Sequence, residues 1–134
     1  MTKLIERGEA ALITANEIST MIHAAGFFER VFEREVDWEA ELDAREAVAF
    51  DEAWIASYET LHDLDPFENE IIRDIREFAF KQTFRLTQNP ELAGYVSDDL
   101  GLIAKAFDSS HDRDFIKGLW ESYLQGIFPN TFPK

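Results

Sequence analysis

Residues Asp65–Gln88 read DPFENEIIRDIREFAFKQTFRLTQ, and the fold depends on this stretch. Asp65 suits an N-cap, Pro66 the first helical position, and Glu68 the third position of a capping box. Apolar side chains recur every three or four positions, the period of a helix with one broad apolar side; they are Phe67, Ile71, Ile72, Ile75, Phe78, Ala79, Phe80 and Phe84. We therefore predict a central core helix near residues 66–86, packed against the first, third and last helices.

The same apolar period is found on both sides of this helix. It predicts further helices over residues 2–25, 27–36, 44–62, 97–107 and 115–124. In the fourth of these, Ser97 is the expected N-cap, with Asp98 and Asp99 in the first turn, where the helix dipole favours negative charge. The chain is thus predicted to be all-α, with about five or six helices in a single-domain bundle spanning residues 1–134.

Two segments have a less regular pattern. Residues 36–44 alternate apolar and acidic side chains, which is typical of a strand, but Asp, Glu and Ala are depleted in strands and no second strand is evident. We interpret the segment as a helix start capped by Asp37, with an extended segment as the alternative. The tail at 127–133 contains two Phe-Pro pairs and cannot be helical. Phe128 and Phe132 are expected to fold back over the bundle; the alternative is a peptide offered to a partner.

Composition excludes several kinds of site. The chain has no cysteine among its 134 residues, which excludes disulfides, thiol catalysis, zinc-thiolate sites and iron-sulfur clusters. Its formal net charge of −14 repels nucleic acid and anionic lipid and favours basic proteins as partners. Charges interrupt the apolar residues near the amino terminus, and no apolar run is long enough to cross a membrane. We expect a soluble, cytoplasmic protein.

The negative charge is concentrated in one part of the chain. Residues 29–65 contain 13 acidic and 3 basic side chains, a net charge of −10, whereas charges on the central helix balance. One interpretation is a solvated face that maintains solubility. The other is a docking surface for a basic protein, with Trp38 either an aromatic anchor or part of the core. The candidate partner-binding residues are Glu33, Glu35, Asp37, Trp38, Glu39, Glu41 and Asp43.

No motif for catalysis is evident. The sequence has no nucleophile elbow and no glycine-rich phosphate loop, so we predict that the protein is not an enzyme and needs no cofactor. Glu59 and His62 have the Glu-x-x-His spacing of di-iron bundles, but the only similar segment, at 108–111, lies in a predicted connection. The basic residues of the central helix are expected to pair with carboxylates rather than to form an anion-binding groove; they are Arg73, Arg76, Lys81 and Arg85.

These observations favour one functional hypothesis over two others. The favoured hypothesis is a small acidic inhibitor, of the bacterial immunity or antitoxin type, that covers a basic protein such as a toxin nuclease. The first alternative is a helical bundle that binds metal through Glu59, His62 and neighbouring carboxylates. The second is an acidic secretion chaperone or adaptor. The sequence leaves the oligomeric state and the identity of the partner open.

Overall fold

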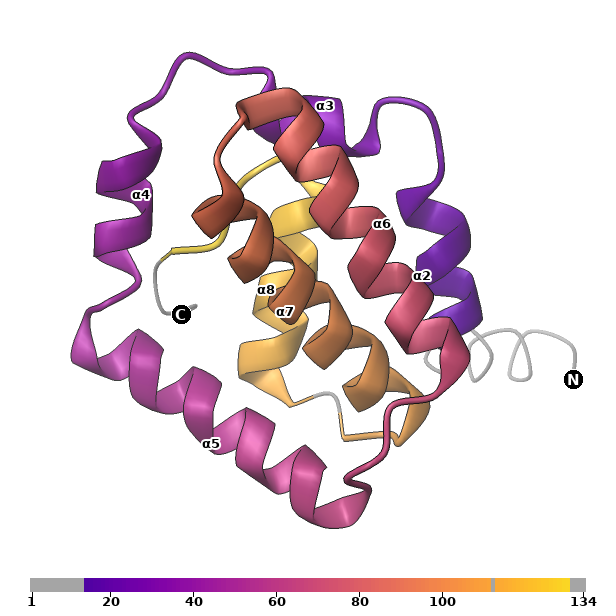
Figure 1. Cartoon of the computed structure of the whole chain (residues 1–134). Coiled ribbons are helices and arrows are strands. Elements are labelled where there is room, and N and C mark those ends of the chain that lie inside the picture. Colours follow the sequence, from indigo (N-terminus) through magenta and orange to yellow (C-terminus); the bar gives the residue numbers. More distant parts are fainter. Residues whose placement is uncertain (1–13, 112, 131–134) are drawn as a thin grey trace, which may run out of the picture.

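The computed structural model describes residues 14–111 and 113–130, and these residues form seven α-helices and no strand (Figure 1). The all-α prediction is therefore confirmed, with more helices than the five or six expected. Residues 2–13 of the first predicted helix lie outside the described ranges. The helices are α2 (Ala15–Ile22), α3 (Phe27–Phe32), α4 (Trp38–Ala44), α5 (Val48–Leu64), α6 (Glu70–Thr87), α7 (Pro90–Asp108) and α8 (Asp114–Leu124).

The helices α6 and α7 form a hairpin at the centre of the fold. Gln88 lies between them in the left-handed conformation, with φ of 57°, and Asn89 caps α7. The most buried helix is α7, which is apolar on nearly all sides because α6, α8, α5 and α2 all pack against it. The predicted central helix is α6, and it packs mainly against α7 and also against α2 and α3. The expected packing of this helix against the third and last predicted helices is therefore wrong.

The predicted start of the central helix is also wrong. The helix begins at Glu70, and the side chain of Asn69 caps it by accepting a 2.9 Å hydrogen bond from the backbone N–H of Ile72. Asp65 instead ends α5, and its carboxylate accepts a bond from the backbone N–H of Phe67. Because α5 continues to Leu64, the next residues must span the distance between α5 and α6, and Phe67 is left 80% exposed.

The helix predicted to start after Ser97 begins seven residues earlier than that cap. Asn89 caps α7 and Pro90 occupies its first turn, so Ser97 lies within the helix. Asp99, expected in the first turn of that helix, is instead fully buried in mid-helix. Gly101 also lies within α7, where a Cβ atom would come within 2.6 Å of the Arg76 side chain. This glycine therefore gives Arg76 room to lie across the helix.

The segment with alternating acids is helical. Asp37 caps α4 by accepting hydrogen bonds from the backbone N–H groups of Glu39 and Ala40, at 3.1 and 3.3 Å. The interpretation as a capped helix start is therefore confirmed, and the strand alternative is wrong. The three acidic side chains of α4 therefore come from two turns of helix instead of from one face of a sheet.

The described part of the tail folds back on the bundle. Phe128 is buried, with its ring 6.4 Å from that of Phe32 and 6.2 Å from that of Trp38. The guanidinium of Arg34 donates a hydrogen bond to the carbonyl of Gly126 and holds the start of the tail. The prediction for Phe128 is thus confirmed, while Phe132 lies outside the described residues. The tail closes the core beneath α4.

Candidate partner-binding surface

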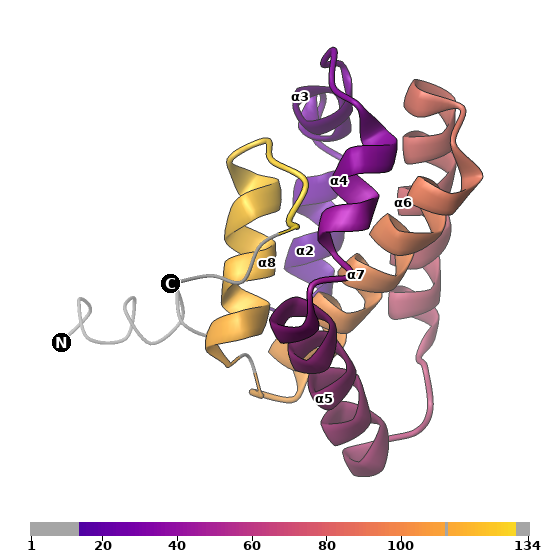
Figure 2. The same cartoon turned by 90° about the vertical axis from the view of Figure 1, so that its left-hand side faces the viewer.

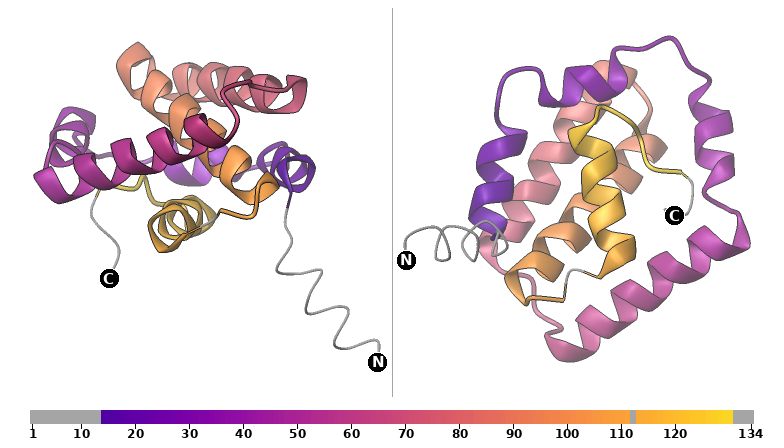
Figure 3. Two further views of the ribbon diagram at one scale, coloured as in Figure 1. Left: turned by 90° about the horizontal axis from the view of Figure 1, so that it is seen from below. Right: turned by 180° about the vertical axis from the view of Figure 1, so that it is seen from behind.

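The helices α4 and α5 follow each other along the rim of the molecule, on the side away from α2 (Figures 1 and 3). Turned toward the viewer, they cover the front of the bundle (Figure 2). Residues 37–65, which we name the α4–α5 segment, contain 10 acidic side chains and a single arginine, Arg45. Since Arg45 is buried, the surface of this segment is acidic.

Most of the predicted partner-binding residues are exposed on or beside α4. Glu33 and Glu35 lie between α3 and α4, and the exposed members of the helix are Glu39 and Asp43 together with its cap, Asp37. Two of the predicted residues differ from the others. Glu41 is half-buried and accepts a 2.8 Å hydrogen bond from Asn130. Trp38 is also half-buried.

Trp38 belongs to the edge of the core. Its ring lies 5.4 Å from that of Phe32 and 6.2 Å from that of Phe128, and it packs against the buried cluster. One side of the indole is therefore fixed by the fold, while the half-buried side chain still reaches the surface among the acids. The structure thus places Trp38 at the edge of the core, and its role as an anchor for a partner stays a prediction.

The basic residues that the structure describes do not neutralise this surface. Of the 13 acids in residues 29–65, only Glu29 forms an ion pair with another described residue. Its partner is Arg85, at 2.8 Å, and the hydrogen bond from this arginine lowers the pKa of Glu29. Arg76 binds Glu68 at 2.7 Å and Asp98 at 3.0 Å, and Lys81 binds Glu77. The expected pairing of the α6 cations is thus confirmed for Arg76, Lys81 and Arg85.

Apolar side chains interrupt the acids on α5. Val48 is 69% exposed and Ile55 is 45% exposed, and they lie two turns apart on the helix. The acids Asp51, Glu52 and Glu59, all exposed, lie between and beside them. Exposed aliphatic groups surrounded by charges resemble the apolar core and polar rim of protein interfaces.

A buried ionic network attaches the α4–α5 segment to the rest of the fold. Arg45, at the end of α4, donates two hydrogen bonds of 2.7 Å to the two carboxylate oxygens of Asp99 in α7. Asp99 also accepts bonds from the Trp54 indole at 2.8 Å and from the Tyr123 hydroxyl at 2.7 Å. Arg45 donates a further bond to the carbonyl of Pro129. One carboxylate thus connects α4, α5, α7 and α8.

Aromatic rings surround this network. The Arg45 guanidinium lies 4.7 Å from the ring centre of Phe50, 5.2 Å from that of Tyr95 and 5.0 Å from that of Phe128. Burial disfavours the arginine's charge, but the adjacent Asp99 carboxylate outweighs this effect, so the pKa of Arg45 is raised. Burial, together with the same carboxylate, raises the pKa of Tyr123 well above its usual value. Both groups keep their protons at neutral pH.

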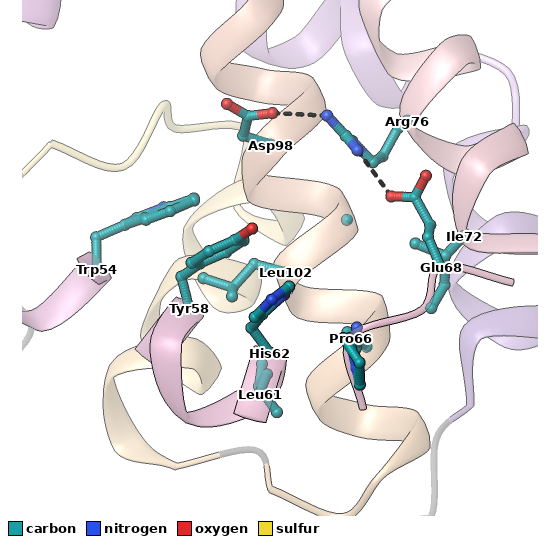
Figure 4. Close-up of a pocket in the computed structure, with 12 residues that line it drawn as sticks. Trp54, Tyr58, Leu61, His62, Pro66, Glu68, Ile72, Arg76, Asp98 and Leu102 are labelled. Carbon is teal, nitrogen blue, oxygen red and sulfur yellow. Dashed lines mark hydrogen bonds and ion pairs between the residues drawn. The ribbon is translucent and has the colours of Figure 1, made fainter. Parts of the chain in front are cut away.

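A groove of about 510 Å³ runs between α5 and the α6–α7 pair (Figure 4). One wall is a stack of rings along α5, with Trp54 and Tyr58 at 6.0 Å and Tyr58 and His62 at 5.7 Å. Opposite them, Figure 4 shows Arg76 between its two carboxylate partners. Leucine side chains, including Leu102, line the groove between these walls. The groove is apolar along α5 and charged along α6 and α7.

A comparison with known families identifies the family of this chain. Residues 17–130 match the family described as Immunity protein PIM1. The chain belongs to this family. No curated protein matches the chain. Membership of the PIM1 immunity family indicates a protein that binds and inhibits a partner, such as a toxin, rather than an enzyme. The prediction of an immunity role is thus supported at the level of the family.

The described residues of this PIM1 family member add no second group of metal ligands to Glu59 and His62. They contain no group of three or more His, Asp or Glu side chains able to hold a metal ion. His62 stacks on Tyr58 in the groove, and Asp108 accepts a hydrogen bond from the backbone of Ala15. These side chains therefore have contacts that serve the fold. None of the described helices has the length and apolarity needed to cross a membrane.

The sequence analysis missed the part of the surface that lies on α5. Its candidates ended at Asp43, because the acids were densest before that residue. Two signals were present: Val48 and Ile55 stand outside the apolar row of Phe50 and Leu61, and acids flank both. An apolar residue outside the core row of a helix is expected to be exposed, and it becomes a candidate contact residue where other features of the surface support binding.

Proposed function

We propose that this PIM1 family member neutralises a basic toxin in the cytoplasm by covering it with the α4–α5 segment. The observation that carries the proposal is the unpaired charge along the rim. Twelve of the 13 acids in residues 29–65 form no ion pair with any described residue, and among the cations of α6 only Arg85 binds one of these acids, Glu29. Such charge accelerates association with a basic partner.

The mixed surface supports binding as well as attraction. Exposed charge at long range mainly raises the association rate, whereas apolar contacts at the centre of an interface slow dissociation. The α4–α5 segment provides both, through its acids and through Val48 and Ile55. The buried Arg45–Asp99 pair holds the segment in place before binding, which reduces the entropy lost on association.

The test is a measurement of association with a basic toxin, sought first in the reading frames next to the one that encodes this chain. Two variants remove equal charge: Glu39→Gln/Asp43→Asn on α4, and the control Glu70→Gln/Asp74→Asn on α6. All four residues are exposed. We expect the α4 variant to lower the association rate by about threefold or more at low salt, and the difference to disappear at high salt. Equal effects of the two variants would contradict docking through this segment.

A further inference from the structure

The groove beside α5 has a second, narrower part. A hollow of about 130 Å³ adjoins the larger one and shares Trp54 and Asp98 with it. Its walls combine three aromatic rings with three carboxylates and a buried arginine; the lining residues are Arg45, Glu46, Phe50, Asp51, Trp54, Tyr95 and Asp98. The volume is close to that of the end of a single long side chain, so the hollow suits one group rather than a whole ligand.

The charge at the mouth of this hollow is uncompensated. Glu46 and Asp51 are exposed and have no ion pair with any described residue. Arg45 lies deeper, where both of its terminal nitrogens already bind Asp99. Asp98 shares Arg76 with Glu68, and the desolvation of Asp98 raises its pKa although the arginine opposes this effect. A cation placed at the mouth would therefore meet net negative charge.

The aromatic walls favour a flat cation. Tyr95 is 39% exposed, and Trp54 is fixed by the hydrogen bond from its indole to Asp99. A guanidinium group stacks on aromatic faces and binds carboxylates through two parallel hydrogen bonds, whereas an ammonium group does neither as well. The rings of Phe50 and Tyr95 already contact one guanidinium, that of the buried Arg45.

We propose that this hollow receives one arginine side chain of the toxin, stacked against Trp54 and Tyr95 and bound by the carboxylates of Glu46 and Asp51. The inference rests on the proposed function for the source of the arginine only. It adds the hollow to the exposed apolar surface of Val48 and Ile55, and Asp51 of α5 lies beside both.

The first experiment requires no toxin. N-acetyl-arginine amide is titrated into the labelled full chain and followed by NMR, with N-acetyl-citrulline amide as the uncharged probe of matched shape. We expect saturable shifts of the Trp54 indole and Tyr95 amide signals with the arginine probe only. Shifts spread evenly over the acids of α4 and α5, or equal shifts with citrulline, would overturn the proposal.

The second experiment compares two variants with equal loss of charge. Glu46→Gln/Asp51→Asn changes the hollow, and Glu39→Gln/Asp43→Asn changes α4; both leave the buried network intact, and urea unfolding checks that both fold. We expect only the first to weaken arginine binding, by at least about threefold. Equal weakening would overturn the inference. If Glu46→Gln/Asp51→Asn lost the probe but bound the toxin as the wild type does, the hollow would not hold an arginine of the toxin, and the proposed function would stand. If the wild type bound the probe but no basic partner, the proposed function would fail while the hollow remained an arginine site.

Discussion

Arg45 and Asp99 stand 54 positions apart in the sequence and meet in the core through two hydrogen bonds of 2.7 Å. Their pairing joins the end of α4 to the middle of α7, and Trp54 brings α5 to the same carboxylate. Because α5 otherwise packs only against α7 and α8 among the closely contacting helices, this network fixes the position of the acidic rim. The surface proposed to bind the toxin therefore depends on an interaction buried beneath it.

Removing the Asp99 charge should destabilise the fold strongly. In Asp99→Asn the charge of Arg45 remains buried without its partner, and breaking such a pair costs about 3–5 kcal/mol. Urea unfolding measures this change. The matched control is Asp98→Asn in the exposed pair with Arg76, where desolvation already raises the pKa of the carboxyl, and a change below about 1 kcal/mol is expected. Similar losses in both variants would show that the network is not specially stabilising.

Because of Tyr123, the free energy of unfolding should fall as the pH becomes alkaline. Its pKa is raised in the folded state, so above pH ~10 the unfolded chain loses this proton first. The contribution of the raised Tyr123 pKa to the free energy of unfolding is complete below that pH. It is lost as the pH rises, at up to about 1.4 kcal/mol per pH unit. Urea unfolding across this range should show the slope in the wild type and in Tyr95→Phe, but not in Tyr123→Phe. A slope that persists in Tyr123→Phe would assign it to another group.

The sequence predicted the helices well but not the partners of their polar residues. Asp99 follows Ser97 and Asp98, a run typical of a solvated first turn. Its burial depends on Arg45, Trp54 and Tyr123, which come from three other segments of the chain. No local pattern links these residues, because the contacts exist only after α4, α5 and α8 have packed on α7.

A similar limit explains the misplaced start of α6. The prediction used Asp65 as the N-cap because Pro66 follows it, and it did not consider Asn69, which is an equally good N-cap residue. The choice depends on the distance between α5 and α6, which the sequence does not state. In the folded chain Asn69 caps the helix, while Asp65 accepts a bond within the connection from Phe67.

This difference gives a direct test of the α6 boundary. Asn69→Ala removes the side chain that accepts from Ile72 and should lower the free energy of unfolding by about 1 kcal/mol. Asp65→Ala removes only a bond within an exposed connection, and a change within about 0.5 kcal/mol is expected. Thermal unfolding of the two variants measures the difference. The reverse order would indicate that the helix begins at Pro66.

The candidate surface was predictable in part. The concentration of acids up to Asp43 was evident in the sequence. In the structure most of these side chains are exposed on or beside the short helix α4. For Val48 and Ile55 the sequence showed only that they stand outside the apolar row of Phe50 and Leu61. Their exposure also depends on α5 lying at the rim with one side against the core, which only the packing of the helices determines.

Truncation of Ile55 should weaken toxin binding without unfolding the protein. The side chain is 45% exposed, so Ile55→Ala opens no internal cavity and should change the free energy of unfolding by less than about 0.5 kcal/mol. If α5 contacts the toxin, the lost apolar contact should cost about 1–2 kcal/mol of binding, mostly through faster dissociation. Surface plasmon resonance with the toxin measures both rates.

The chain provides a matched control for this substitution. Ile127 is 47% exposed and follows α8, next to Gly126, which lies against the backbone of Arg30 in α3. Ile127→Ala therefore removes the same atoms from a side chain of similar exposure, and it should leave the dissociation rate of the toxin unchanged. Since the α4 acids should alter mainly association and Ile55 mainly dissociation, the two effects should also add when combined. Faster dissociation of Ile127→Ala alone would place the contact on the α3 end instead.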